Sequence, residues 1–287
     1  MSLTVAQGFD TFLRWLTPTD IERSKASSHR HAIEAKLDSK FGVFQMFESG
    51  SLGHGTGVSS HSDADFFVSL KSVKPLRSQS ILSSVRETLQ ARFPSTPIRV
   101  SSPAVVLDFG GGYERVEIIP AYYKAAVDGV SKYDIPGVVD DWLESTPRMH
   151  LQYVNDCNKQ PASGKAKSMA RLVKAWKYYR EVPISSFYLE MRAAQYIAAQ
   201  STIVWSIDLY HFLKDLQNSG IAAMNDPTGS TGWIQPCSTP SKLADARSKL
   251  DTAVSRACKA MRADLDEKPV PAFEQLNLLF NYEFPSR

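Results

Sequence analysis

Hydrophobic and polar positions along the chain predict an α+β protein, with strands in its first half and helices in its second. Short apolar or alternating runs predict strands over residues 41–47, 65–70, 98–100, 104–109 and 113–119. Helical spacing predicts helices over residues 18–40, 75–93, 164–180, 207–218, 240–262 and 272–282, and one that begins at Thr146-Pro147. The change of pattern divides the chain into two lobes, residues 1–145 and 146–287.

Capping signals place the ends of several of these elements. The first long helix is predicted to begin at Thr17–Asp20, where a threonine cap, a proline in the first helical position and an acid follow one another. Its expected buried positions include Ile21, Ala32, Ile33 and Leu37. Ser163 is the predicted cap of the helix over residues 164–180, which directs Met169, Leu172, Val173 and Trp176 inward. Gly110–Gly112 predicts a hairpin between two strands.

Candidate chemistry gathers in the segment Glu48–Leu70. Gly50-Ser51 and the glycines at 53, 55 and 57 let bare backbone approach a ligand, so the loop can direct N–H groups at phosphate oxygens. Asp63 and Asp65 stand two residues apart at the start of a strand, which puts both carboxylates on one face. Such a pair favours a divalent cation such as Mg²⁺ between them. The alternative is a polar turn with two solvated aspartates, and neither dinucleotide-binding nor Walker spacing is present.

This segment resembles the signature of the polymerase-β-like nucleotidyltransferases. Gly50-Ser51, Gly55–Val58 and Ser62–Val68 are most similar to the bacterial cGAS/DncV-like nucleotidyltransferases, or CD-NTases, although Gly57 stands where that family usually has alanine. The resemblance covers about residues 20–260 and implies a nucleotidyltransferase sheet, a long N-terminal helix and a helical C-terminal lobe that closes over the nucleotide. By this resemblance, residues 1–145 are the catalytic lobe.

A third acid is implied by the same resemblance. Glu117–Ala121 occupies the place of a family segment that begins with aspartate, so Glu117 becomes the third metal carboxylate beside Asp63 and Asp65. The implied cofactor is a pair of Mg²⁺ or Mn²⁺ ions. Glutamate keeps the charge and the oxygen donors, and its extra methylene requires a shifted strand or rotamer. Asp108 is interpreted as a solvated acid at a strand end.

A second motif in the helical lobe resembles the family's donor-phosphate element. It consists of Arg171–Lys177 followed by Pro183–Glu190. The resemblance implies that Lys174 and Ser186 contact donor phosphates and that Phe187 stacks on a base, together with Gly50 and Ser51 on the phosphates. These residue types suit those roles. The structural alternative is a solvated basic helix face, an ordinary serine cap and a core phenylalanine.

The implied function is the joining of NTPs into a cyclic di- or trinucleotide, a second messenger that acts on an effector in antiphage signalling. Two alternatives stay open: transfer of NMP to an RNA or protein acceptor, and a catalytically impaired relative that only binds nucleotides. The resemblance also leaves open an activating partner protein or ligand. A net charge of +3 does not indicate a basic groove for nucleic acid, so stable nucleic-acid binding is not expected.

Composition adds expectations about the setting of the protein. Three cysteines without metal-binding spacing predict reduced thiols, as in the cytoplasm. No signal-like N-terminus or apolar run of about 18 residues is present, so no membrane association is expected. Together these features predict a cytoplasmic protein.

Overall fold

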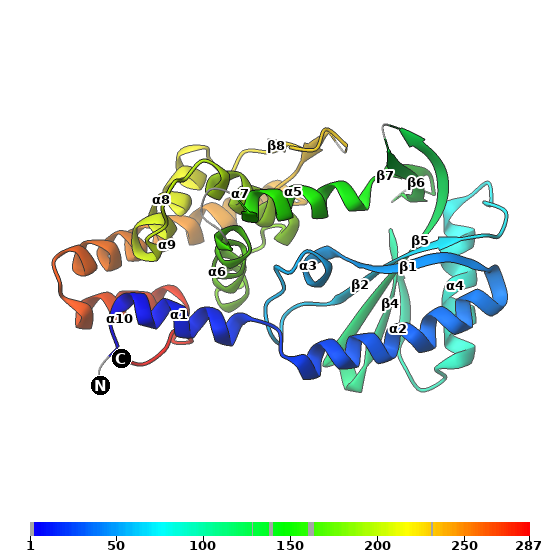
Figure 1. The fold of residues 1–287 in the computed structure, drawn as a ribbon, viewed down its shortest axis with the longest axis horizontal. Coiled ribbons are helices and arrows are strands. Elements are labelled where there is room, and N and C mark those ends of the chain that lie inside the picture. Colours follow the sequence, from blue (N-terminus) through cyan, green and yellow to red (C-terminus); the bar gives the residue numbers. More distant parts are fainter. Residues whose placement is uncertain (1–2, 128, 138–139, 160–163, 231) are drawn as a thin grey trace. The chain divides into compact units, whose positions relative to one another are not determined.

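The computed structural model describes residues 3–127, 129–137, 140–159, 164–230 and 232–287 (Figure 1). The chain forms two compact units. The sheet unit comprises residues 18–55 and 59–152, and the helical unit comprises residues 1–17, 56–58 and 153–287. The two units divide near residue 152, whereas the sequence pattern changes at residue 145. However, residues 1–17 and the short segment 56–58 belong to the helical unit.

The sheet unit is built on a mixed sheet in the order β1-β2-β5-β4-β3. These strands are β1 (Val43–Ser49), β2 (Ala64–Leu70), β5 (Glu114–Val127), β4 (Ala104–Phe109) and β3 (Ile98–Ser101). Strands β2 and β5 are parallel, and the other pairs of this path are antiparallel. The second half of β5 pairs with β6 (Val130–Pro136), which pairs with β7 (Trp142–Ser145). The sequence patterns indicated neither β6 nor β7, and they ended β5 at residue 119.

One face of the sheet is covered by two helices, α2 (Asp20–Phe41) and α4 (Ser78–Arg92) (Figure 1). Alternate residues of β2, among them Phe66 and Val68, are fully buried there against Ile33 and Leu37 of α2. Each such side chain contributes about 1.5–3 kcal/mol through removal of apolar surface from water. The burial fixes the register of β2, so its other residues, including Asp65, must point to the opposite face.

Helix α2 begins later than the capping pattern predicted. Its cap is Thr19, not Thr17, because the Thr19 hydroxyl accepts a bond from the Glu22 N–H, and the Glu22 carboxylate accepts one from the Thr19 N–H. Ile21 is 71% exposed, contrary to the prediction, whereas Ile33 and Leu37 are buried as expected and Ala32 is only partly buried.

The helical unit contains α1 (Val5–Leu16), α6 (Lys165–Tyr179), α7 (Ser186–Ala198), α8 (Trp205–Asn218), α9 (Pro240–Leu265) and α10 (Pro269–Leu279), with a small hairpin of β8 (Met224–Asn225) and β9 (Trp233–Ile234). Helix α5 (Pro147–Lys159) begins at the predicted Thr146-Pro147 and crosses the boundary between the units. The inward positions predicted on α6 are all buried. The predicted cap at Ser163 lies outside the described residues.

Helix α1 was not predicted, and it completes the core of the helical unit. Phe12 lies with its ring centroid 4.7 Å from that of Phe280 and 5.1 Å from that of Phe284. Phe9 contacts Phe284 in an edge-on geometry at 5.2 Å. The two ends of the chain are thus joined by aromatic packing, which no local pattern in either segment reveals.

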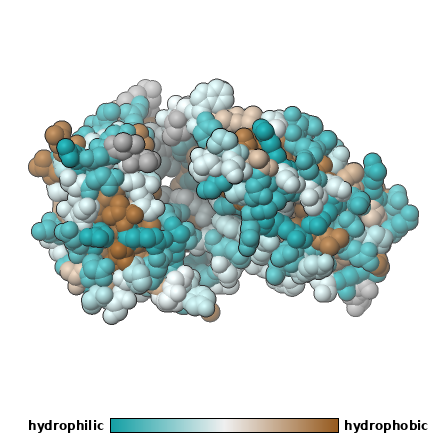
Figure 2. All heavy atoms as spheres, turned by 180° about the vertical axis from the view of Figure 1, so that it is seen from behind, coloured by the Kyte–Doolittle hydropathy of each residue, from teal (hydrophilic) through white to brown (hydrophobic). Residues whose placement is uncertain are grey.

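The surface carries only scattered apolar residues on the face drawn in Figure 2, where small hydrophobic patches are separated by hydrophilic side chains. Across the described ranges, no helix combines the length and apolar character needed to cross a bilayer.

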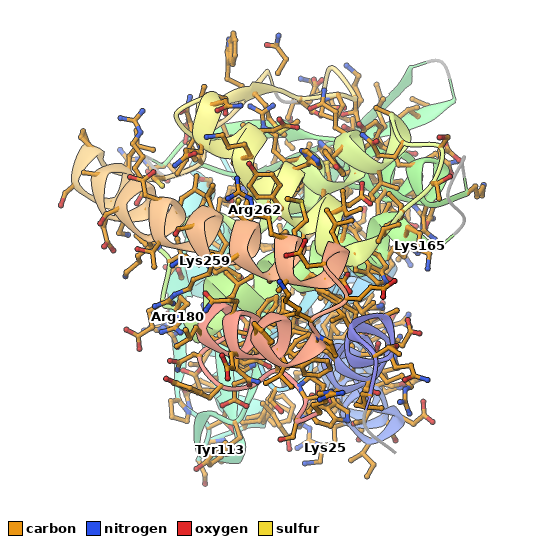
Figure 3. All side chains as sticks on the ribbon, turned by 90° about the vertical axis from the view of Figure 1, so that its left-hand side faces the viewer. Lys25, Tyr113, Lys165, Arg180, Lys259 and Arg262 are labelled. Atoms are coloured by element: carbon orange, nitrogen blue, oxygen red, sulfur yellow. The ribbon has the colours of Figure 1, made fainter. Side chains whose placement is uncertain are left out.

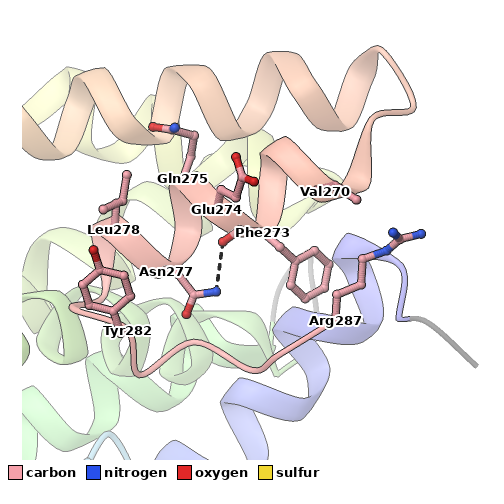
Figure 4. Close-up of a pocket in the computed structure, with 8 residues that line it drawn as sticks. All are labelled: Val270, Phe273, Glu274, Gln275, Asn277, Leu278, Tyr282 and Arg287. Carbon is pink, nitrogen blue, oxygen red and sulfur yellow. Dashed lines mark hydrogen bonds between the residues drawn. The ribbon is translucent and has the colours of Figure 1, made fainter.

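A groove on the helical unit is lined by Phe273 and Asn277 of α10 and by Tyr282 and Arg287 of the C-terminal segment (Figure 4).

Candidate active site

The turn after β1 fits closely around Asp65. Gly50 begins the short helix α3 (Gly50–Gly53) with φ +55°, a conformation that strongly favours glycine. A Cβ atom at Gly50 would overlap the carboxylate of Asp65. Strand β1 pairs Ser49 with Asp65, which brings this turn against the start of β2. The turn at Gly50 and the Asp65 carboxylate therefore form one local arrangement.

Glu117 lies directly beside Asp65. The parallel pairing of β2 and β5 places these two residues in register, and both lie on the sheet face away from α2 and α4. Asp63 precedes β2 by one residue. Its side chain is 40% exposed, and that of Glu117 is 23% exposed. The structure therefore brings all three predicted acids to one edge of one sheet face.

An arginine stands among these acids. Arg115 precedes Glu117 by two residues on β5 and shares its face; it forms an ion pair with Glu117 and places Nε 3.4 Å from Oδ2 of Asp63. Partial burial lowers the pKa of Arg115, but the charges of Asp63 and Glu117 outweigh this and raise it overall. Arg115 is therefore a permanent cation next to two of the predicted metal ligands.

The donor chemistry of this site suits a hard divalent cation, since the three acids supply only carboxylate oxygens. Among the described residues, however, no three His, Cys, Asp or Glu side chains stand close enough to hold a metal ion as drawn. Arg115 pairs with Asp63 and Glu117. The donor chemistry therefore fits a metal, and binding one requires these side chains to rearrange.

The glycine-rich loop before the acids is anchored in the helical unit. Thr56 and Val58 are completely buried there. From α6, Lys174 Nζ donates to the Thr56 hydroxyl at 2.9 Å and to the Thr56 carbonyl at 3.3 Å, and Arg171 Nε donates to the Gly57 carbonyl at 3.2 Å. Only residues 59–62 separate this anchored segment from Asp63.

Lys174 is buried within the protein, whereas a residue that binds an incoming phosphate must be accessible. Its side chain is 0% exposed, and Nζ lies 2.7 Å from Oε2 of Glu190. With the two bonds to Thr56, all three ammonium donors are used within the protein. A phosphate could reach Lys174 only after a buried ion pair had been broken. The predicted phosphate contact of Lys174 therefore does not agree with this structure.

The neighbouring lysine on α6 occupies the place expected for such a contact. Lys177 is partly exposed, and its Nζ lies 2.5 Å from the hydroxyl of Ser186. Ser186 is the first residue of α7, whose cap is Ser185, so the cap is one residue earlier than the predicted contact residue. Phe187 is partly buried against the helical core. Lys177, and not the predicted Lys174, therefore contacts Ser186 in this structure.

Ser59 and Ser60, which follow the segment 56–58, form hydrogen bonds with Glu22 of α2. Glu22 accepts bonds from the Ser60 N–H at 2.7 Å and from the Ser59 hydroxyl at 3.0 Å, in addition to its bond from Thr19. Burial raises the pKa of Glu22, but the hydrogen bonds from Thr19 and Ser60 outweigh it and hold the pKa below the ordinary value. The capping acid of α2 therefore also positions the loop that leads to Asp63.

Sequence reasoning gave no role to Arg115 or Glu190 and missed the contacts of Glu22 with the loop. The signal for Arg115 was present, because alternation on β5 puts residues 115 and 117 on one face. The spacing of Lys174 and Glu190 gave no such signal, since these residues lie on different helices. Their pairing depends on how α6 and α7 pack.

The fold is that of the polymerase-β-like nucleotidyltransferases. Among solved structures, DncV of Vibrio cholerae, a cyclic AMP-GMP synthase and prokaryotic cGAS homologue, matches with a TM-score of 0.77 at 12% identity over 99% of this chain and 97% of that chain. CdnC of E. coli, solved with ATP, matches with a TM-score of 0.75 at 17% identity over 98% and 99%. CdnG of Bradyrhizobium diazoefficiens, solved with GTP, gives 0.75 at 12% over 96% and 98%.

A family comparison makes the assignment more specific. Residues 3–158 match the Second Messenger Oligonucleotide or Dinucleotide Synthetase domain. The chain therefore belongs to this family, the cGAS/DncV-like nucleotidyltransferases, as its motifs predicted. A search of curated proteins gives no match.

Proposed function

We propose that this protein joins nucleoside triphosphates into a cyclic di- or trinucleotide. The observation that carries the proposal is the in-register pairing of Asp65 with Glu117. Beside this pair, the turn at residue 50 leaves room for the Asp65 carboxylate because residue 50 is a glycine. Family membership supplies the context, because the matching domain is described as one that makes second-messenger oligonucleotides or dinucleotides.

In the proposed reaction, the ribose hydroxyl of an acceptor nucleotide attacks the α-phosphate of a donor NTP and pyrophosphate leaves. A second attack within the linear dinucleotide closes the ring and releases a second pyrophosphate. For a trinucleotide, a third NTP is first joined with loss of a second pyrophosphate, and ring closure then releases the third. Divalent ions held by Asp63, Asp65 and Glu117 would supply charge neutralisation and activation of the hydroxyl. The residues of this chain orient the reactants and balance the negative charge of the triphosphate.

Residues of the helical unit take distinct parts in this proposal. Lys177 and Ser186 bind donor phosphate, since the partly exposed lysine of α6 contacts the hydroxyl at the start of α7. Phe187 offers a partly exposed ring at the same helix start for a base. Lys174 acts as a positioning residue that holds Thr56, while Gly50 and Ser51 remain the proposed contacts of the sheet unit with phosphate.

The biological setting is proposed from the family. CdnC of E. coli has been solved in complex with HORMA-deltaN, so an activating partner protein is one candidate mode of control here. The product would act on a downstream effector in antiphage signalling. A cytoplasmic location of this chemistry is part of the same proposal.

The test is incubation of purified protein with four radiolabelled NTPs and Mg²⁺ or Mn²⁺, followed by phosphatase and chromatography. A phosphatase-resistant product that disappears in the Asp63→Ala/Asp65→Ala variant is expected. Omission of each NTP in turn then names the bases. Product formed only when an RNA or protein acceptor is added would overturn cyclisation in favour of transfer to that acceptor.

Glu117 provides a second, sharper comparison. If the glutamate serves the site well, Glu117→Asp should keep or reduce synthesis, because the strand and Arg115 are arranged around the longer side chain. A large gain from a near-zero wild-type rate would instead show that the natural protein is an impaired enzyme. If product appears only when a partner protein is added, the protein catalyses the same reaction but requires that partner as an activator.

A further inference from the structure

Four charged residues cross the catalytic face of the sheet from strand to strand. Arg99 of β3 pairs with Asp108 of β4, and Asp108 lies in register opposite Arg115 of β5. Arg115 in turn pairs with Glu117 and Asp63. Because cross-strand neighbours share a face, Asp108, Arg115 and Glu117 project on the same side. Asp108 is thus part of a charge ladder and not an isolated solvated acid.

Within this ladder, Arg115 occupies the role that a metal ion has in the proposed reaction. Three carboxylates held at one sheet edge repel one another unless a positive charge lies close by. The Arg115 guanidinium supplies that charge from β5, the strand that also carries Glu117. Its Nε is buried without a hydrogen-bond partner, although it lies within ion-pair distance of Asp63. An arginine held mainly by charge, with incomplete hydrogen bonding, is suited to leaving when a stronger cation arrives.

We propose that Arg115 is an internal counter-ion that competes with divalent metal for Asp63 and Glu117. The inference rests on the proposed function, in which these acids are metal ligands. Metal binding then requires the guanidinium to leave the two carboxylates, and Asp108 on the neighbouring strand offers it a carboxylate on the same face. Arg115 thereby sets the metal concentration at which the site becomes loaded and keeps the acids together before loading.

The test measures metal binding without nucleotide. Free Mn²⁺ is followed by electron paramagnetic resonance during titration of wild type, Arg115→Gln and Arg115→Lys. Removal of a unit charge about 4 Å from the ligands should tighten Mn²⁺ binding by about tenfold or more in Arg115→Gln. Arg115→Lys keeps the charge, so its affinity should stay near that of the wild type. Arg77→Gln, which removes an exposed arginine paired with Asp140 elsewhere in the same unit, is the matched control.

A second readout distinguishes competition from a merely structural role. In EDTA, Arg115→Gln should melt at a lower temperature than wild type, because its acids repel one another, and Mn²⁺ should raise its Tm more than that of wild type. A lower Tm with unchanged Mn²⁺ affinity would overturn the proposal and leave the metal site standing. Failure of every variant to bind Mn²⁺ would overturn both this proposal and the three-acid metal site.

Discussion

At the scale of single residues, the site depends on side chains that neutralise one another before any ligand arrives. Arg115 balances Glu117 and Asp63 on the sheet, and Lys174 balances Glu190 in the helical unit. The two pairs differ in burial: Lys174 is completely enclosed, whereas Arg115 is 37% exposed. A buried pair holds structure because breaking it leaves an uncompensated charge, and an exposed pair can exchange partners.

The burial of Lys174 leads to a prediction that separates it from Lys177. Lys174→Met should lower the free energy of unfolding by about 3–5 kcal/mol, because Glu190 would remain buried without its cation. Lys177→Met should change stability by less than about 1 kcal/mol and raise the KM for NTP. Denaturant unfolding and steady-state kinetics measure the two effects.

The double variant Lys174→Met/Glu190→Leu controls this comparison. It removes both charges, so it should recover much of the stability lost in Lys174→Met. If Lys174→Met were instead stable and raised only the KM, the lysine would be a substrate ligand and the positioning role would be wrong.

At the scale of elements, the carboxylate of Glu22 accepts hydrogen bonds both from the start of α2 and from the loop that leads to Asp63. Glu22 closes the capping box of α2 and also accepts bonds from Ser59 and Ser60. From the same helix, Lys25 lies 2.5 Å from Glu114 at the start of β5, and His29 lies 2.8 Å from it. Figure 3 labels Lys25, and also Tyr113 at the neighbouring hairpin turn. Helix α2 thus holds both ends of the region that presents the acids.

Glu22→Gln should lower stability by about 1 kcal/mol at neutral pH, the cost of losing a helix cap at an exposed position. The folded-state pKa of Glu22 lies below its ordinary value of 4.5, so the carboxylate contributes stability above that value and loses it as the pH falls through the folded pKa. The stability difference between wild type and Glu22→Gln should therefore be constant above about pH 5 and close in acid. Urea unfolding at pH 3 to 7 measures it; a difference that widened in acid would contradict the assignment.

At the scale of the whole molecule, the chain closes its helical unit with segments from both ends. Phe9 and Phe12 of α1 pack on Phe280 and Phe284 near the C-terminus. Arg180, labelled in Figure 3, donates to the carbonyls of Leu278 and Leu279 at the end of α10, and Arg256 of α9 donates to Leu278 as well. These contacts fix the C-terminal segment against residues distant in sequence.

Phe12→Ala should therefore destabilise the helical unit by about 3–5 kcal/mol, since it empties a site between α1 and the C-terminal segment. Calorimetry should show this as a lower Tm for the transition of the helical unit. Trp15→Ala, on the exposed side of the same helix with 57% of its surface accessible, is the matched control and should change the Tm little. Equal losses in both variants would contradict the packing of α1.

The sequence by itself determined the class of fold and the positions of the three acids. Alternation in β2 assigned Asp63 and Asp65 to one face, and the motif around Glu117 placed the third acid on a neighbouring strand. These features are local, because a strand's period decides which side chains share a face. The sequence patterns did not predict helix α1 or strands β6 and β7, and they misplaced the cap of α2. In these segments tertiary contacts outweigh the local sequence signals.

Only the tertiary structure decided which lysine is enclosed and which is accessible. Lys174 and Lys177 stand three residues apart on α6, and both suit a phosphate equally well by residue type. The packing of α7 brings Glu190 to Lys174 and Ser186 to Lys177, and the loop at Thr56 covers the first of these pairs. A charged group's role depends on its partners and its exposure to water, and residues far apart in the chain supply both.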